Sequence, residues 1–349
     1  MNTVLSSLRL EEITTMGALE ALRPEWDGLW ERCGAATPFQ SPEWLLTWWR
    51  HFGGNMLWVL ALRNRGRLAG LAPLFIHPIQ EHKKRQVSFI GAGITDYLDF
   101  LIEPEIADAG TRLIMEHLAL HRSRWDICDF RDIRPGSPLL HAEIPGHLEV
   151  RRMSPDVCPV LPLPATVEEF YAGLPTSYRI RVRRAQKAMA KYGDMRIETA
   201  DEDTFPEFLD ALFRLHQARW LQRNLSGVLS RYDIQAFHWD AAAGLLKRGC
   251  LRLYVMRKGE ITAAALYAFA YGSRVYCYLG GFAPEMARLS PGTVIMGHAI
   301  EDAIRSGRRE FDFLRGKENY KYVWGAKDRV SHRLVLWHSQ AEDKDPGIL

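Results

Sequence analysis

The sequence predicts an α/β protein that consists of two tandem, related domains. The chain has 349 residues, of which 47% are hydrophobic, so it is long enough and apolar enough to bury two cores. The stretch SPDVCPVLPLP at 154–164 contains four prolines, which forbid a helix and favour an extended connector. The same order of predicted elements occurs on both sides of this connector. We therefore expect domains at 1–153 and 154–340, followed by a flexible tail at 341–349.

The first half carries the repeated unit of hairpin, strand, helix and strand. Two apolar runs on either side of the turn Asn64-Arg65-Gly66 predict a β-hairpin. A later segment has its apolar residues at mostly helical spacing. The predicted elements are a hairpin at 57–63 and 68–76, strands at 86–90, 97–102 and 125–132, and a helix at 106–121.

The second half repeats this order after two inserted helices. Its third strand ends in Gly280-Gly281, and Gly307 stops an amphipathic helix. The strings CDF at 128–130 and FDF at 311–313 take equivalent places in the two halves, with Asp129 opposite Asp312. The predicted elements are helices at 172–192 and 205–220, a hairpin at 250–256 and 261–269, strands at 274–279 and 310–314, and a helix at 293–306.

Charge, cysteine usage and hydropathy exclude several classes of protein. The chain has 45 Lys and Arg against 42 Asp and Glu, and a net charge of +3 predicts no DNA partner. Five scattered cysteines without a CxxC pair argue against a disulfide framework or a zinc knuckle, and favour the cytoplasm. The start of the chain lacks a secretory signal, and the longest apolar stretch, 261–271, is far shorter than the roughly 20 residues that span a membrane. We expect a cytoplasmic protein without a membrane span.

The helix predicted at 172–192 has an unbalanced basic face. From Arg179 to Lys191 it holds six cations and no carboxylate, whereas a solvated face normally mixes both signs. Arg179 and Arg183 are therefore candidates to bind phosphates of a nucleotide, a coenzyme A tail or an RNA strand. A solvated helix whose charge has no function is the alternative. Because no aromatic residues alternate with the cations, a dedicated RNA-binding module is not indicated.

The segment between the third strand and the last helix of the second half has features of an anion-binding and carbonyl-binding site. Gly280 and Gly281 permit a bulge, which would leave backbone N–H groups free to polarise a carbonyl. The run Ser290-Pro291-Gly292-Thr293 opens the helix with Ser as the N-cap and Pro at the first helical position. Free N–H groups at such an end can hold a phosphate. A plain turn and helix cap is the alternative.

The densest group of reactive side chains is FDFLRGKENYKYVWGAK at 311–327, which follows a hydrophobic strand. α/β proteins place their sites at such strand ends. Lys321 is suited to neutralise a developing oxyanion, and Tyr320 is suited to donate a proton to a leaving group. Asp312 and Arg315 are expected to position them. A surface loop above packed aromatic residues is the alternative.

Other catalytic motifs are missing from the sequence. It contains no GxGxxG, GxxxxGK[ST], HExxH or GxSxG, and we expect no pair of histidines at metal-binding spacing and no metal cofactor. His216, in the string LHQARW at 215–220, is the one histidine considered as a catalytic base. A core or surface histidine is the alternative.

Several of these segments together resemble a known family. They are SYRIRVRRAQKAMAKYG at 177–193, LHQARW, the stretch 278–293 and above all FDFLRGKENYKYVWG at 311–325, with PFQSPEWLLTWWRHFG at 38–53 and GAGITDYLDFL at 91–101 in the first half. They resemble the GNAT-fold acetyltransferase family that includes CelD-type proteins of cellulose and exopolysaccharide biosynthesis, which is similar to the FemAB peptidyltransferases. The resemblance spans residues 20–338 and implies tandem GNAT-like domains with mixed sheets flanked by helices.

The resemblance implies acyl transfer from acetyl-CoA or another acyl-CoA to an amine or hydroxyl of a small-molecule or saccharide acceptor. The donor would lie in a split between the strands at 274–279 and 310–314, with a backbone N–H near Gly280 facing the thioester oxygen. Its pyrophosphate would meet the helix that starts near Pro291, and Arg219 is placed among the donor-binding residues.

One departure from the family pattern leaves two other functions open. The GNAT phosphate loop is R/Q-x-x-G-x-G/A, whereas the run 288–293 has Pro291 in place of the first Gly, which removes one N–H donor. The second candidate is therefore a ligase that uses aminoacyl-tRNA, as FemAB-type relatives do. The third is a non-catalytic partner in a polysaccharide-synthesis assembly. The sequence predicts no oligomeric state.

Overall fold

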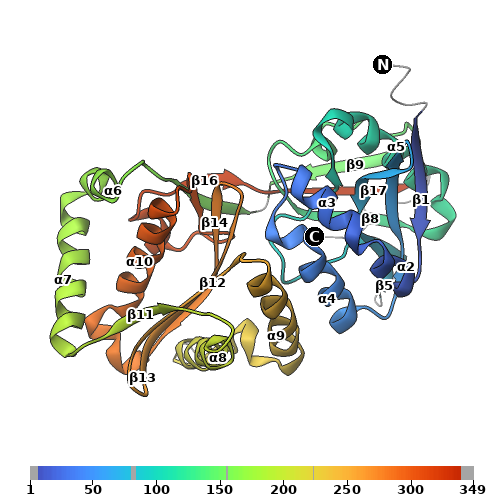
Figure 1. The fold of residues 1–349 in the computed structure, drawn as a ribbon. Coiled ribbons are helices and arrows are strands. Elements are labelled where there is room, and N and C mark those ends of the chain that lie inside the picture. Colours follow the sequence, from blue (N-terminus) through green and yellow to red (C-terminus); the bar gives the residue numbers. More distant parts are fainter. Residues whose placement is uncertain (1–6, 80–83, 155, 223, 339–349) are drawn as a thin grey trace. The chain divides into compact units, whose positions relative to one another are not determined.

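The computed structural model describes residues 7–79, 84–154, 156–222 and 224–338. The chain forms two compact α/β units (Figure 1). Unit 1 consists of Met1–Asp156 and Val330–Leu349, and unit 2 consists of Val157–Arg329. The predicted tail at 341–349 lies outside the described residues. Within those residues, no helix combines the length and the apolar character that crossing a membrane requires.

Unit 2 is built on a seven-stranded mixed sheet with the order β11-β12-β13-β14-β15-β10-β16. β14 and β15 run parallel, whereas β11 to β14 form an antiparallel meander and β10 runs antiparallel to β15. The strands are β10 (Val157–Pro162), β11 (Arg196–Thr199), β12 (Leu251–Lys258), β13 (Ile261–Tyr271), β14 (Arg274–Phe282), β15 (Glu310–Asp312) and β16 (Lys327–Val330).

Helices cover both faces of this sheet. α8 and α9 pack on one face, and α7 and α10 lie on the other (Figure 1). β13 is consequently buried along most of its length, which suits its nearly continuous run of Ala, Leu and Phe. The helices are α6 (Val167–Gly173), α7 (Thr176–Tyr192), α8 (Phe205–Leu221), α9 (Tyr232–Lys247), α10 (Pro291–Arg305) and α11 (Asn319–Tyr322).

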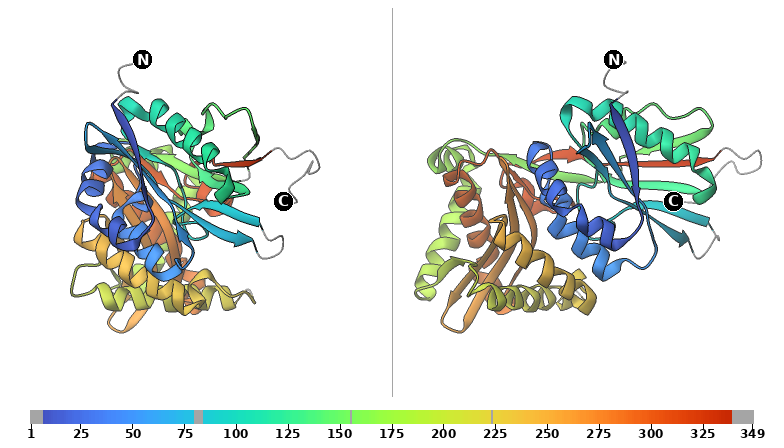
Figure 2. Two further views of the ribbon diagram at one scale, coloured as in Figure 1. Left: turned by 90° about the vertical axis from the view of Figure 1, so that its right-hand side faces the viewer. Right: turned by 45° about the vertical axis from the view of Figure 1, so that its right-hand side comes forward.

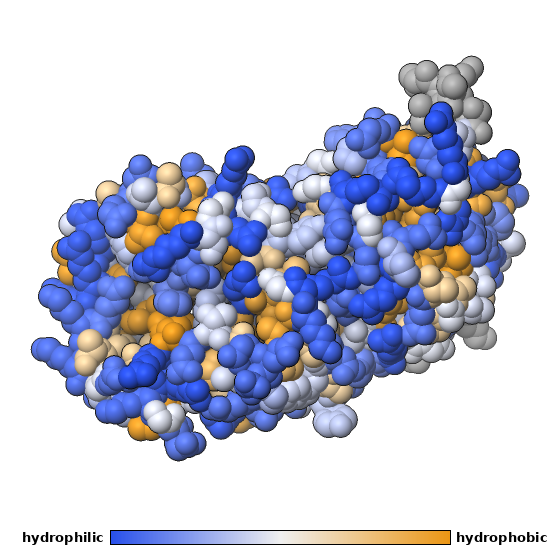
Figure 3. Space-filling model, in the orientation of Figure 1, coloured by the Kyte–Doolittle hydropathy of each residue, from blue (hydrophilic) through white to orange (hydrophobic). Residues whose placement is uncertain are grey.

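The basic helix begins later than the sequence predicts. The predicted helix from 172 is divided into α6 and α7, because Pro175 interrupts the helical hydrogen bonds. α7 buries Tyr178, Val182, Ala185 and Met189, as its apolar spacing predicts. Its cations from Arg181 to Lys191 are exposed, and hydrophilic side chains dominate this side of the molecule (Figure 3).

Unit 1 contains a four-stranded sheet, β1-β3-β4-β7, and a six-stranded sheet, β2-β5-β6-β8-β17-β9. The apolar run predicted as a single strand at 68–76 turns at Pro73, so its two parts join different sheets. The elements are β1 (Leu8–Ile13), α2 (Met16–Ala21), α3 (Arg23–Arg32), α4 (Pro42–Phe52), β2 (Met56–Leu57), β3 (Val59–Asn64), β4 (Arg67–Ala72), β5 (Leu74–Ile79), β6 (Lys84–Phe89), β7 (Leu101–Ile102), α5 (Ala107–Leu120), β8 (Ile127–Ile133), β9 (Leu148–Met153) and β17 (His332–His338).

The two units repeat one topology, which confirms the tandem α/β prediction. In unit 1 an antiparallel hairpin, β3-β4, precedes the parallel pair β6 and β8, and α5 lies between that pair in the chain. In unit 2 the hairpin β12-β13 precedes the parallel pair β14 and β15, with α10 between them. Asp129 and Asp312 lie on the equivalent strands β8 and β15.

The end of the chain does not belong to the second unit, contrary to the predicted boundary at 340. β17 inserts between β8 and β9 of unit 1 and pairs antiparallel with both (Figure 2). Its Leu334 and Leu336 are fully buried in the core of unit 1. The first crossing between the units lies at Asp156–Val157 rather than at 153–154.

Candidate active site

Two neighbouring parallel strands of unit 2 part after a short pairing. β14 and β15 pair from Arg274 and Glu310 to Tyr276 and Asp312, where β15 ends while β14 continues to Phe282. The register of β14 against β13 shifts at this level, so that Tyr278 is an additional residue on β14. Such a bulge interrupts the ladder and bends the strand. It lies two residues before the predicted position at Gly280.

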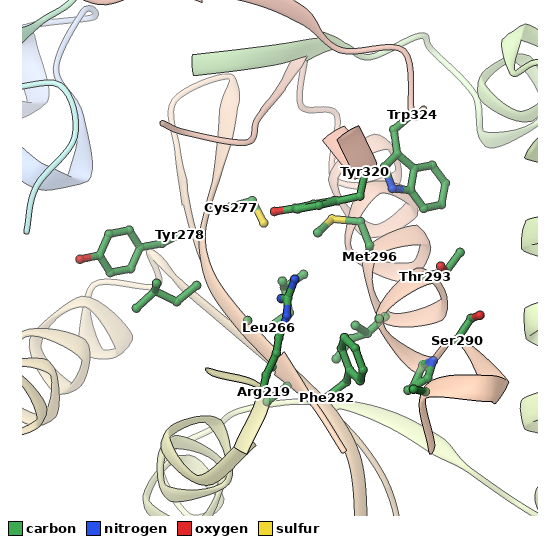
Figure 4. A pocket seen from close by; sticks show the side chains of 18 of the residues that line it. Arg219, Leu266, Cys277, Tyr278, Phe282, Ser290, Thr293, Met296, Tyr320 and Trp324 are labelled. Atoms are coloured by element: carbon green, nitrogen blue, oxygen red, sulfur yellow. The ribbon is translucent and has the colours of Figure 1, made fainter. Parts of the chain in front are cut away.

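A pocket of about 280 Å³ lies where the two strands part (Figure 4). The bulged end of β14 and the first turns of α10 form opposite walls, and α7, α8 and the segment around α11 complete it. Its lining residues are Tyr178, Arg181, Arg219, Ala265, Leu266, Cys277, Tyr278, Leu279, Gly280, Gly281, Phe282, Ala287, Ser290, Pro291, Gly292, Thr293, Ile295, Met296, Tyr320 and Trp324. Among the predicted residues, this set includes Gly280, Gly281, Ser290, Gly292, Thr293, Arg219 and Tyr320.

The first turn of α10 has few N–H groups left for a ligand. Thr293 and Val294 both donate to the carbonyl oxygen of Ser290, at 3.0 and 3.4 Å, and Pro291 has no N–H. Ser290 takes a left-handed conformation with φ 56°, and its hydroxyl makes no cap hydrogen bond, unlike the predicted N-cap. In the described structure, Gly292 is the first-turn residue whose N–H has no partner. This amide lies at the positive end of the helix.

Gly281 allows α8 to approach β14 closely. A Cβ atom at this position would lie 2.5 Å from the amide nitrogen of His216 and 2.6 Å from the carbonyl carbon of Leu215. The backbone of α8 therefore packs directly on the strand, which brings Arg219 to the pocket one turn later.

The cations at the pocket differ in part from those the sequence analysis selects. Arg219 extends into the pocket with its guanidinium 5.4 Å from the centre of the Phe282 ring (Figure 4). Arg181 lines the pocket, whereas Arg179 and Arg183 do not. Arg181 lies three residues after the buried Tyr178 on α7, and this helical spacing is the signal that would have selected it.

Tyr320, at the start of α11, points its hydroxyl into the pocket toward Cys277 (Figure 4). As a whole, the residue is 40% exposed. Burial of its phenol, followed by the electrostatic effect of Cys277, raises the pKa of Tyr320 above its ordinary value. The hydroxyl therefore carries its proton at neutral pH, as a proton donor must.

Lys321 does not face the pocket, in contrast to its predicted role. It is 2% exposed, and its ammonium donates to the carbonyl oxygens of Leu314, Arg315 and Gly316 at 3.1, 2.8 and 3.2 Å. Glu318 is its ion-pair partner at 2.9 Å. An ammonium has three donors, so Lys321 binds the turn that follows β15 and has none left for a substrate.

Asp312 and Arg315 also lie outside the pocket lining. Asp312 is fully buried, accepts the N–H of Leu314 at 2.8 Å and lies 3.6 Å from the guanidinium of Arg329. Arg315 is exposed. These contacts assign Asp312 to the turn after β15 rather than to the positioning of a catalytic group.

His216 is a core histidine, which is the alternative that the sequence analysis leaves open. It is 3% exposed and absent from the pocket lining, and its Nε2 accepts the indole N–H of Trp220 at 3.0 Å. Burial, followed by the charge of Arg219, lowers its pKa to about 4. The apolar face of α8 turns this side chain inward.

The expectation of no histidine pair at metal-binding spacing is wrong. His117 lies in the last turn of α5 and His121, four residues later, is the C-cap of that helix, and Glu12 lies beside them. The i, i+4 spacing within a predicted helix was the available signal.

Comparisons with known proteins show similarity in sequence and in fold. Residues 176–322 match the acetyltransferase (GNAT) domain. FemX has a similar structure, with 13% identity and a TM-score of 0.67 over 93% of this chain and 96% of that chain. No curated protein matches the sequence.

Two further solved structures share the fold. L-PGS from Bacillus licheniformis has 12% identity and a TM-score of 0.52 over 84% of this chain and 91% of that one. A conserved protein of unknown function from Bacteroides thetaiotaomicron VPI-5482 has 10% identity and a TM-score of 0.58 over 95% and 99%. Residues 176–322, which lie in the second unit, therefore match an acetyltransferase (GNAT) domain, and the solved structures share the fold of the chain.

Proposed function

We propose that the chain transfers an acyl group, with acetyl as the preferred group, from an acyl-CoA thioester to an amine or hydroxyl acceptor. The observation that carries the proposal is the pocket at the parting of β14 and β15, which is lined by the bulged strand end and by the start of α10. The separated strands expose backbone amides to an incoming carbonyl compound, and the helix start offers its positive end to a phosphate.

In the proposed reaction the thioester carbonyl faces the amide of Gly280. The acceptor nitrogen or oxygen attacks the carbonyl carbon and forms the new bond, and the carbon–sulfur bond breaks. Tyr320 donates its proton to the leaving thiolate and regains one from the attacking group, so that no proton is lost. The amide of Gly292 and the guanidinium groups of Arg181 and Arg219 hold the donor phosphates.

A second donor, aminoacyl-tRNA, is favoured by the basic face of α7. Five of its six cations are exposed, namely Arg181, Arg183, Arg184, Lys187 and Lys191. Four of these five, all except Arg181, lie outside the pocket lining, where a single small donor does not need them, whereas an RNA phosphate backbone does. Pro291 also removes one amide from the phosphate site that coenzyme A would use.

The acceptor belongs to a small molecule or a saccharide in this proposal, with polysaccharide or cell-envelope synthesis as the setting. We place the reaction in the cytoplasm, where acyl-CoA and aminoacyl-tRNA occur. The five cysteines are free and buried, which suits a reducing compartment.

Donor binding is the direct test, and it requires no knowledge of the acceptor. The purified chain is heated with acetyl-CoA, with coenzyme A and with charged tRNA, and its melting temperature is recorded. A donor at about 100 times its Kd should stabilise the chain by about 2.7 kcal/mol. We expect Arg219→Ala to remove the shift, and Arg196→Ala, an exposed control on β11 outside the pocket, to keep it.

The outcomes separate the candidates. A shift with acetyl-CoA supports the first donor, and a shift with charged tRNA that disappears after ribonuclease treatment supports the second. If neither donor binds, the chain is the non-catalytic partner that the sequence analysis keeps as its third candidate.

A further inference from the structure

A polar cluster in unit 1 lies where β1 contacts α5, outside the acyltransferase unit. Glu12 comes from β1, His117 comes from the last turn of α5, and His121 is the C-cap residue of that helix. One ligand atom of each residue lies within 4.8 Å of the other two, and all three side chains are partly exposed. The cluster therefore combines a carboxylate with two imidazoles at a site that solvent ions can reach.

The hydrogen bond of His121 defines which ring nitrogen is available. Its Nδ1 lies 2.9 Å from the carbonyl oxygen of His117, and because a carbonyl only accepts, Nδ1 carries the proton. In the neutral ring, Nε2 then holds the lone pair, 3.9 Å from Oε1 of Glu12. A backbone carbonyl that fixes the tautomer in this way is typical of metal-binding histidines.

Glu12 is fixed in a comparable way. Arg124 donates to its Oε2 at 2.7 Å, while Oε1 lies 2.7 Å from Nε2 of His117. The carboxylate therefore has one oxygen held by Arg124 and the other directed at the histidine pair.

The buried aromatic ring of Trp58 packs against the cluster. The fully buried Trp58 ring lies 6.1 and 6.2 Å from the rings of His117 and His121, and the Arg124 guanidinium stacks on it at 4.7 Å. The two imidazoles are 4.1 Å apart.

We propose that Glu12, His117 and His121 form a binding site for one divalent transition metal ion, with zinc as the preferred ion. The ligands are Oε1 of Glu12 and Nε2 of both histidines, a set of two nitrogens and one oxygen that suits zinc. In the metal-bound state His117 carries its proton on Nδ1, so Nε2 can coordinate. Water takes the fourth position. The ion links β1 to α5 and stabilises unit 1.

The competing explanation is a metal-free ion-pair cluster in which Arg124 and the histidines only neutralise Glu12. The test uses the full-length chain, with any affinity tag removed and its metals stripped by EDTA. Zinc chloride is titrated at pH 7.5 by calorimetry, and cobalt is added separately to record its visible absorption. We expect one zinc ion per chain and the absorption bands of four-coordinate cobalt.

Three variants decide between the two explanations. His121→Ala and Glu12→Gln should each weaken zinc binding at least ~10-fold, while His141→Ala, an exposed control in the same unit, should not change it. Zinc should raise the melting temperature of the parent chain and of His141→Ala only. Circular dichroism in EDTA checks that each variant is folded. The proposal is overturned if the parent chain binds no stoichiometric zinc, or if folded His121→Ala binds it equally well.

Discussion

Tyr320 is the residue whose chemistry can be tested most directly, because its hydroxyl has a defined place in the pocket. Tyr320→Phe removes only the oxygen, so we expect turnover to fall about 10²-fold while the melting temperature stays the same. Steady-state kinetics with the donor identified by the binding assay checks this. Tyr322→Phe, whose hydroxyl donates to Asp328 instead, is the matched control. Equal rates for the parent chain and Tyr320→Phe would exclude Tyr320 as the proton donor.

The pH profile follows from the same environment. Because burial raises the pKa of Tyr320, the phenol remains protonated across the neutral range. A rate that needs this proton should therefore decrease only on the alkaline side, above a pH of about 10, the ordinary value for tyrosine. A decrease centred near neutral pH would assign proton donation to another group.

Lys321 has a structural role that predicts a different phenotype. Lys321→Met leaves three carbonyl oxygens of the turn 314–316 without their donor, at a position that is 2% exposed. We expect a loss of unfolding free energy of about 2–4 kcal/mol, measured by urea denaturation. Lys317→Met, at an exposed position of the same segment, should change stability little. A Lys321→Met variant that is stable but inactive would contradict this structural role and indicate that Lys321 takes part in catalysis.

His216 makes stability depend on pH. Its pKa is about 4 in the folded chain, below the ordinary 6.5, so the unfolded chain binds more protons between these values. The contribution of His216 to the free energy of unfolding is therefore fully present above pH 6.5, and the free energy falls by about 3 kcal/mol as the pH drops to 4. His216→Gln keeps an acceptor for Trp220 and should reduce this slope. Denaturation midpoints between pH 4 and 7 measure it, and identical slopes would contradict the assignment.

Among the elements, the contact between α8 and β14 connects packing with the site. Gly281→Ala places a Cβ within 3 Å of the α8 backbone, so the helix must move, at a cost of about 1–3 kcal/mol. Because Arg219 moves with α8, donor binding should weaken as well. At Gly280 the atom nearest to an added Cβ is a flexible side-chain carbon of Leu266, at 3.1 Å, so Gly280→Ala should destabilise the chain less than Gly281→Ala. Melting curves with and without donor compare the two variants, and equal stability would show that α8 accommodates the methyl group.

At the scale of the whole molecule, the crossing of β17 makes unit 1 depend on the end of the chain. A chain that stops at Ser331 loses the strand between β8 and β9 and the burial of Leu334, Val335 and Leu336. Burial of these side chains contributes about 5–8 kcal/mol to the free energy of unfolding, which is comparable with the stability of a whole domain. We expect unit 1 to be degraded rapidly in limited proteolysis. A chain that stops at His338 is the control, and equal resistance of both chains would contradict the prediction.

Residue patterns determined much of the fold. The hairpin turns, the apolar stripe of α7 and the repeated order of elements are local or periodic features, so the α/β class and the two related halves could be read from the sequence. The glycines of β14, the start of α10 and Tyr320 were found in the same way, because they lie next to strand and helix ends. The family resemblance added the split between β14 and β15.

Only the tertiary structure decided which side chains face a ligand and which strands join which sheet. Lys321 and His216 carry the same chemical groups wherever they lie, but contacts from the turn after β15 and from the core of α8 remove them from the pocket, while Arg181 enters it. β17 follows β16 directly in sequence, yet it pairs with strands 180 to 210 residues earlier. Strand pairing and side-chain direction depend on contacts distant in the chain, and a one-dimensional pattern does not record them.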